Sequence, residues 1–246
     1  MDFVQKQLSN LLIKVLSGEV RSLYKSSTHT YEQIAKSIQP GDVLLVEGHQ
    51  RFSAAVKYLT QSNWSHSALY IGEEQLIEAD LELGVQKIPL NSYEKFHTRI
   101  CRPVGLTDED LQRILEYAHG RIGHHYDLKN VIDLARYLFP TPPVPDKWKR
   151  NILQFGSGDP TKVICSSMIA EAFQSVRYPI LPLVDRSGQK VRFLKRKHHT
   201  LFTPADFDRS PYFKIIKPTI ETGFDYKKVA WETLTEQSPL GQMGKD

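Results

Sequence analysis

The fold is decided by residues 66–79, which read HSALYIGEEQLIEA. Two short apolar runs, 67–71 and 75–79, flank a loop that begins with Gly72, and this pattern predicts a β-hairpin. Because side chains alternate between the two faces of a strand, the alternation predicts one apolar face and one polar face. The apolar face takes Leu69, Ile71, Ile77, Ala79 and Leu81, and the polar face takes His66, Tyr70 and Glu78.

The register of this hairpin decides whether His66 and Glu78 meet. They share a face only if the loop holds an odd number of residues, since the side-chain period of a strand is two. A three-residue loop, 72–74, sets His66 opposite Asp80 and makes Glu78 the diagonal neighbour, about 7–8 Å away at the backbone. A two-residue turn would put Glu78 on the other face, so we expect the three-residue loop.

Other strand-like runs surround the hairpin and predict one small, mostly antiparallel sheet in an α+β fold. They are residues 42–46, 84–88 and 99–104, which make five strands together with the two runs of the hairpin. Apolar periodicity predicts helices at 52–59, 107–122, 128–139 and 166–176, and the first forty residues are also helical in pattern. A long loop is expected at 140–160, and the stretch after 176 is expected to supply no more than a final strand near 213–216.

The composition is that of an ordinary globular protein. Of 246 residues, 40% are hydrophobic and 24% are charged. Disordered, collagen-like and coiled-coil chains are excluded, and no apolar run approaches the roughly 20 residues of a membrane-spanning helix. The formal net charge of +4 neither demands nor excludes an anionic partner, and we expect no nucleic acid. Two cysteines and the lack of a cleavable leader pattern predict a cytoplasmic protein.

Cys165 is the candidate nucleophile, because it lies where a loop meets the predicted helix 166–176. Backbone N–H groups and the positive end of the helix dipole favour a thiolate there, and the same amides can hold an oxyanion. A thiolate needs an imidazole to carry its proton and an acceptor to orient that imidazole, which suits His66 and Glu78. The alternatives are a small buried cysteine and a solvated Glu78. The other histidines are expected to be solvated, namely His29, His49, His97, His119, His124, His125, His198 and His199.

These residues carry a family resemblance. The string 66–79 resembles the histidine strand and hairpin of the NlpC-type papain-like superfamily, whose third polar residue also follows the histidine by twelve positions. Cys165 follows His66 by 99 positions, as in the circularly permuted branch, the permuted papain-like amidases (YiiX-like). The strings GDVLLV (41–46) and ICSS (164–167) are also similar to that branch, and the resemblance covers about residues 40–215.

The resemblance implies a site and a reaction. Cys165 would be the nucleophile, His66 the base and Glu78 the orienting acid, with Tyr126, Ser65 and Ser166 lining the substrate and oxyanion position. The implied activity is hydrolysis of an amide (peptide, isopeptide or N-acyl) through a thioester, without a cofactor. We expect a helical extension at 1–39, the hydrolase domain at 40–220 and a tail at 221–246.

Two other functions stay open. A lipid acyltransferase or phospholipase could use the same Cys–His chemistry, with peripheral membrane contact through the N-terminal helix. A non-catalytic binding module on this fold is the second. The expected partner is a small peptide-like or lipid-like acyl substrate, and the histidine spacing predicts no metal site.

Overall fold

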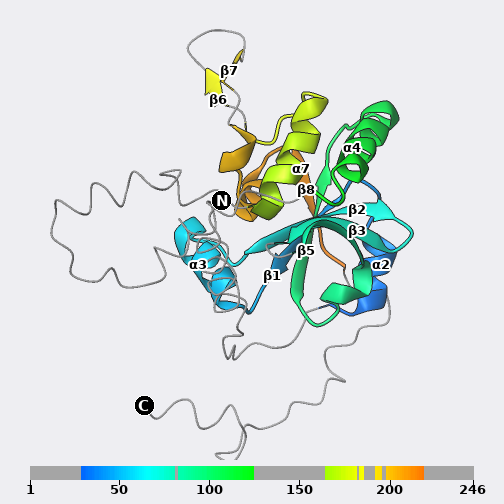
Figure 1. Cartoon of the computed structure of the whole chain (residues 1–246). Helices are drawn as coiled ribbons and strands as arrows, with labels where there is room; N and C mark the ends of the chain where they lie inside the picture. The colour runs from blue at the N-terminus through cyan, green and yellow to red at the C-terminus, as the bar shows by residue number, and fades with distance from the viewer. Residues whose placement is uncertain are drawn as a thin grey trace, which may run out of the picture.

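The computed structural model describes residues 29–80, 83–124, 164–181, 183–185, 192–195 and 198–218. Helices and strands follow one another along these residues (Figure 1) in this order: α2 (Tyr31–Ser37), β1 (Val43–Glu47), α3 (Arg51–Thr60), β2 (His66–Gly72), β3 (Gln75–Asp80), β4 (Gly84–Pro89), the 3₁₀ turn η1 (Leu90–Tyr93), β5 (His97–Pro103), α4 (Asp108–Gly120), α7 (Ile164–Ser175), β6 (Leu183–Asp185), β7 (Arg192–Lys195), η2 (His199–Leu201), α8 (Pro204–Arg209) and β8 (Phe213–Ile216).

The predicted sheet is present and antiparallel throughout. Its six strands are ordered β4-β3-β2-β1-β5-β8. The five strands expected in the sheet belong to it, and the final strand expected near 213–216 joins them as β8 beside β5. Together with the helices, this sheet confirms the α+β fold class.

The β2–β3 loop differs from the expected one. Gly72 pairs with Gln75, so the turn contains two residues, Glu73 and Glu74, and the expected three-residue loop is wrong. Both glutamates have positive φ, 50° and 55°. Positive φ at both central residues is the type I′ geometry, whose twist matches that of the flanking strands.

A β-bulge compensates for the shorter turn. The register shifts between Tyr70 and Gly72, where Ile71 is the additional residue of β2. Beyond the bulge the pairing has the parity of an odd loop, so His66 and Glu78 point to the same face. The shared face is therefore confirmed, for a different local reason.

Helices cover both faces of the sheet (Figure 1). One core lies between the sheet and α7 with α4, and it contains Val43, Leu45, Leu69, Ile77, Ala79, Ile114, Ala118, Met168, Ile169, Ala172 and Phe173. The second core lies beneath α2 and contains Ile34, Ile38, Leu44, Val46, Ala68, Tyr70, Leu76 and Ile100. Tyr70 is only 7% exposed, so the expected polar face is wrong along most of its length because α2 packs on it.

Downstream of β5 the outcome is mixed. α4 begins at its expected cap, where the Thr107 hydroxyl accepts from the Asp110 N–H at 3.2 Å, but it ends at Gly120 rather than at Ile122. The stretch after 176 contains β6, β7, η2 and α8 before β8, so the expectation of a single strand there is wrong. The expected helix 128–139, the loop 140–160 and residues 1–28 lie outside the described residues, and the domain boundaries stay predictions.

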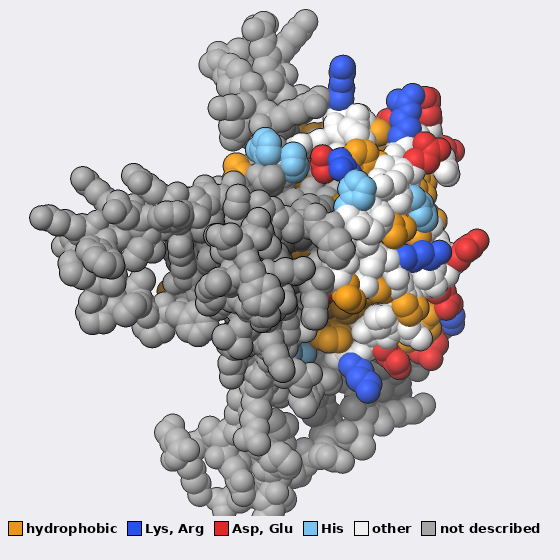
Figure 2. Space-filling model, viewed as in Figure 1, with side chains coloured by type: hydrophobic (Ala, Val, Ile, Leu, Met, Phe, Trp, Pro, Cys, Tyr) orange, Lys and Arg blue, Asp and Glu red, His pale blue; other side chains and the backbone are white. Residues whose placement is uncertain are grey.

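The surface visible in Figure 2 carries acidic and basic side chains mixed along the rim of the described residues. This mixture agrees with the small formal net charge of +4. No helix in the described ranges combines the length and the apolar character needed to cross a bilayer.

Candidate active site

The first turn of α7 brings Cys165 to the sheet. This helix packs across β2 and β3, the strands that carry His66 and Glu78. Cys165 is 3% exposed, and its side chain hydrogen-bonds the His66 ring. The fold thus joins a sulfur and an imidazole that are 99 positions apart in the sequence.

The other side of the His66 ring faces Glu78. His66 Nε2 lies 2.8 Å from Glu78 Oε2. Because Nε2 is taken by the acid, Nδ1 is the ring nitrogen left for the sulfur of Cys165. The imidazole therefore stands between a thiol and a carboxylate, which is the order of nucleophile, base and orienting acid.

The Glu78 carboxylate is 5% exposed and lies among three hydrogen-bonding groups. His66 and the Tyr93 hydroxyl both meet Oε2, and Gln86 Nε2 donates to Oε1 at 3.0 Å. Burial raises the pKa of Glu78, but the hydrogen bonds and the charge of His66 outweigh it, so the pKa lies below its ordinary value. Glu78 is therefore an anion at neutral pH.

His66 is held in its charged form. Burial lowers the pKa of His66, yet the charges and hydrogen bonds of Cys165 and Glu78 raise it more, and the net pKa lies well above the ordinary value. An imidazolium beside the sulfur stabilises the thiolate. The site thus places a charged His66 ring between the Cys165 sulfur and the Glu78 carboxylate.

Cys101 shows what an ordinary buried thiol looks like in the same protein. It lies in β5, is fully buried and belongs to the core beneath α7. Burial raises the pKa of Cys101 far above its ordinary value. Cys101 is a core residue, and it provides an internal control for the reactivity of Cys165.

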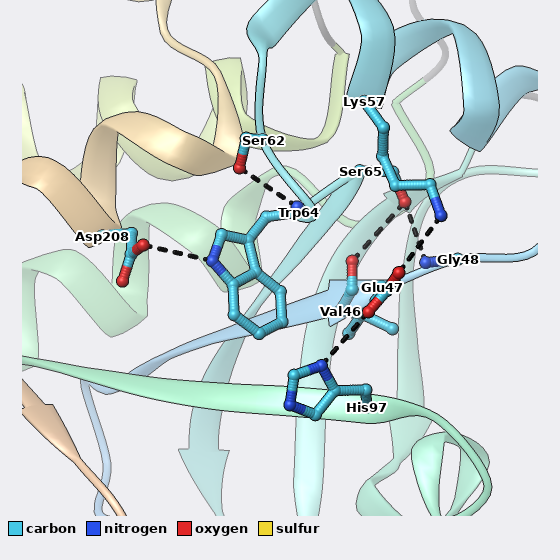
Figure 3. Close-up of polar contacts among 9 residues, drawn as sticks. All are labelled: Val46, Glu47, Gly48, Lys57, Ser62, Trp64, Ser65, His97 and Asp208. Carbon is cyan, nitrogen blue, oxygen red and sulfur yellow. Dashed lines mark hydrogen bonds and ion pairs between the residues drawn. The ribbon is translucent and has the colours of Figure 1, made fainter. Parts of the chain in front are cut away.

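The segment that leads into His66 is firmly anchored (Figure 3). Ser65 Oγ accepts from the Gly48 N–H at 2.9 Å and lies 3.5 Å from the Val46 carbonyl oxygen. Trp64 Nε1 donates to Asp208 Oδ2 at 3.2 Å. These bonds tie the start of β2 to the end of β1 and to α8. The Ser65 hydroxyl thus serves the backbone, and its lining of the substrate position stays a prediction.

Two further residues were expected at the site. The Ser166 side chain is fully buried and donates to the Phe202 carbonyl, which fastens α7 to the segment before α8. A contribution of Ser166 to the oxyanion position stays a prediction. Tyr126 lies outside the described residues.

One histidine expected in solvent is part of a second pair. His97 lies on β5, with Nδ1 3.2 Å from Glu47 Oε2 and its ring centroid 5.2 Å from that of Trp64 (Figure 3). The expectation of a solvated His97 is wrong, because β5 begins at His97 rather than at Arg99 and so holds this side chain beside Glu47 and Trp64. A histidine beside an acid is therefore not diagnostic in this chain, and the contact with Cys165 distinguishes His66.

Tyr93 and Gln86 were missed by the sequence reasoning. Gln86 lies directly opposite Glu78 in the β3–β4 register, so the strand pattern could have identified it. Tyr93 lies in a short 3₁₀ turn, for which the sequence gives no periodic signal.

A comparison with protein families finds the family that the sequence resembles. The model of the family described as permuted papain-like amidase enzyme, YaeF/YiiX, C92 family, matches residues 37–138. The chain resembles the permuted papain-like amidases. The matched range includes His66 and Glu78, whereas Cys165 lies beyond it. The predicted resemblance is confirmed, and the expected class, a cysteine amidase- or peptidase-like hydrolase, agrees with this family of amidases.

Individual relatives are distant. The probable lipoprotein peptidase YaeF of Escherichia coli (strain K12) is 22% identical over 165 residues, 61% of this chain and 60% of that protein. The chain thus spans about 60% of the length of this curated relative. The crystal structure of the metalloprotein yiiX from Escherichia coli O157:H7 aligns with a TM-score of 0.48 and 14% identity, over 74% of this chain and 98% of that chain.

Within the described part of this chain, no group of three or more His, Cys, Asp or Glu side chains is arranged to hold a metal ion. The residues of the site are instead committed to one another, since the Glu78 oxygens meet His66, Tyr93 and Gln86.

Proposed function

We propose that this protein is a cysteine hydrolase that cleaves an amide bond through a thioester acyl-enzyme. The observation that carries the proposal is the position of the His66 ring, which contacts Cys165 on one side and Glu78 on the other. The resemblance to the permuted papain-like amidases supports an amide as the bond that is cleaved.

The first half of the reaction forms the thioester. The Cys165 thiolate adds to the carbonyl carbon, and backbone N–H groups at the start of α7 hold the resulting oxyanion. The His66 imidazolium then gives its proton to the leaving nitrogen as the C–N bond breaks. The amine departs, and a neutral imidazole remains beside the acylated sulfur.

The second half releases the acid. Water attacks the thioester while neutral His66 accepts its proton, the C–S bond breaks, and the sulfur leaves as the thiolate. The imidazolium is thereby restored beside Glu78. The acid keeps the ring oriented and compensates its charge, so each half-reaction begins with the imidazole in place.

The substrate class follows from the amide chemistry and from the relative. Peptide, isopeptide and N-acyl bonds all provide the required carbonyl and nitrogen. Because the similar Escherichia coli protein is called a probable lipoprotein peptidase, an acylated peptide is the first substrate to test. A cytoplasmic setting and a membrane contact through residues 1–39 are further parts of the proposal.

The test is to trap the acyl-enzyme. The full-length chain is exposed to N-acyl peptides, matched esters and a lipid extract, quenched in acid and analysed by mass spectrometry. We expect an adduct on Cys165 from the amide substrates, its retention in Cys101→Ala and its loss in Cys165→Ala. A fatty acyl adduct from the lipid esters, with none from amides, would refute the amidase and favour an acyltransferase or phospholipase.

Thiol reactivity separates an enzyme from a binding module without a substrate. At neutral pH, iodoacetamide is expected to modify Cys165 much faster than buried Cys101, and His66→Ala should remove the difference. Equal and slow modification of both cysteines would contradict the hydrolase.

A further inference from the structure

Tyr93 is held rigidly beside the hairpin that carries the acid. It ends η1, whose first residue, Leu90, is 2% exposed and donates its N–H to the Glu74 carbonyl at 2.8 Å. The Phe96 ring packs against Tyr93 edge-on, with the centroids 5.6 Å apart. The short 3₁₀ turn therefore holds the Tyr93 side chain in a fixed place.

Two members of the candidate site touch Tyr93. Its hydroxyl donates to Glu78 Oε2, the same oxygen that faces His66 Nε2. Its ring lies against the His66 ring, with centroids 5.9 Å apart and planes at 46°. A donor on the shared oxygen restricts the rotation of the Glu78 carboxylate. Tyr93 therefore fixes the direction in which Glu78 Oε2 faces His66.

The second carboxylate oxygen is held separately. Gln86, opposite Glu78 on β4, donates to Oε1 at 3.0 Å. With Gln86 on one oxygen and Tyr93 on the other, the acid has a defined orientation before any substrate binds. A buried carboxylate needs such donors to remain ionised.

The surrounding charges keep Tyr93 protonated. Burial raises the pKa of Tyr93, and the negative charges of Glu78, Cys165 and Asp80 raise it further, well above the ordinary value. The Tyr93 hydroxyl therefore keeps its proton, and can donate it to Glu78, at neutral and acidic pH.

We propose that Tyr93 is a positioning residue, which acts through Glu78 by holding its carboxylate ionised and turned towards His66. The inference rests on the proposed function, because it assigns Tyr93 a part in preparing the same site. Without the hydroxyl, Glu78 binds a proton more readily as the pH falls. The imidazolium then loses its charged neighbour, and the thiolate loses its support at mildly acidic pH.

The experiment compares Tyr93→Phe with a matched control, Tyr31→Phe, in the full-length chain. The Tyr31 hydroxyl also donates to a glutamate, Glu74 Oε2 at 2.7 Å, but this pair is exposed and outside the site. The rate at which iodoacetamide modifies Cys165 is measured by peptide mass spectrometry from mildly acidic to mildly alkaline pH. We expect Tyr93→Phe to react about tenfold more slowly than wild type at about pH 5, and Tyr31→Phe to follow wild type.

A second measurement separates positioning from structural support. In a Glu78→Gln background, Tyr93→Phe should change the rate by less than about twofold, since the carboxylate through which it acts is gone. The ratio of the acidic to the alkaline rate is taken within each variant, so a loss of folded protein cancels. An equal slowing in both backgrounds would overturn the inference, as would a Tyr93→Phe profile that overlays wild type.

The outcomes also distinguish this inference from the proposed function. Fast modification of wild-type Cys165 with an unchanged Tyr93→Phe profile refutes the role of Tyr93 alone. If wild-type Cys165 reacts as slowly as Cys101, the proposed hydrolase fails and the inference about Tyr93 falls with it.

Discussion

Replacing Glu78 by glutamine tests the electrostatic design of the site. The substitution keeps the shape of the side chain but removes the charge 2.8 Å from His66 Nε2. It also sets an NH₂ group among neighbours that already donate, Tyr93 and Gln86. A hydrogen bond to a charged group contributes about 1.5–3 kcal/mol, and each 1.4 kcal/mol is roughly tenfold, so we expect thiolate reactivity to fall about 10- to 100-fold.

The assay is the rate of Cys165 modification by iodoacetamide at neutral pH, followed by hydrolysis of any amide that forms the acyl-enzyme. The control is Glu47→Gln, which removes the acid from the second His–Glu pair, where Glu47 Oε2 is 3.2 Å from His97 Nδ1. Glu47→Gln should stay within about twofold of wild type, because this pair is partly exposed. Equal rates for wild type and Glu78→Gln would refute the coupling of acid, imidazole and sulfur.

Other changes address stability. Ser65→Ala removes the buried hydroxyl that joins β2 to β1 and should cost about 1–3 kcal/mol; an unchanged thermal midpoint would contradict this. Arg102→Met leaves fully buried Asp42 without the guanidinium 2.7 Å away, so the free energy of unfolding from chemical denaturation should fall by about 3–5 kcal/mol. A smaller loss than that of Ser65→Ala would contradict this. The His66–Glu78 pair should contribute fully between the ordinary pKa values, 4.5 and 6.5. Its contribution is lost as the pH falls through the lowered pKa of Glu78 or rises through the raised pKa of His66, and the wild type minus Glu78→Gln difference in thermal midpoint, measured against pH, checks this.

The sheet was predictable because its strands are short, apolar and well separated by turn residues. In the sequence, Pro40-Gly41 precedes β1 and Pro211 precedes β8. Turn residues therefore mark the start of the first strand and the start of the last strand. Cys165 and His66 were also predictable. Cys165 lies at the start of a predicted helix, where a thiolate is favoured, and His66 begins a predicted strand on the same face as Glu78.

The turn and the bulge were not predictable from local signals. Glu73 and Glu74 adopt positive φ, although glycine and asparagine are the residues that favour it, so the loop reads as three residues beginning at Gly72. The bulge at Ile71 lies in a strand whose two faces pack on two different cores, which is a non-local constraint that the local sequence does not mark.

Tyr93 was invisible for a different reason. Its contact with Glu78 joins a non-periodic turn to a strand fifteen positions earlier, and no spacing rule covers such a contact. α8, by contrast, had a start signal that was overlooked, because Thr203 and Asp206 form a capping box around Pro204.

Because of the bulge at Ile71, the number of residues between His66 and Glu78 decides whether the two side chains lie on the same face of the hairpin. Deleting Ile71 alone would straighten β2, rotate every residue before it to the opposite side and aim His66 away from Glu78 while leaving both residues in the sequence. Natural variants and engineered grafts should therefore change the number of residues between the imidazole and the acid only in even steps. If a related sequence lacks one residue between the histidine and the acid, we expect another bulge or a different turn length to return both side chains to one face.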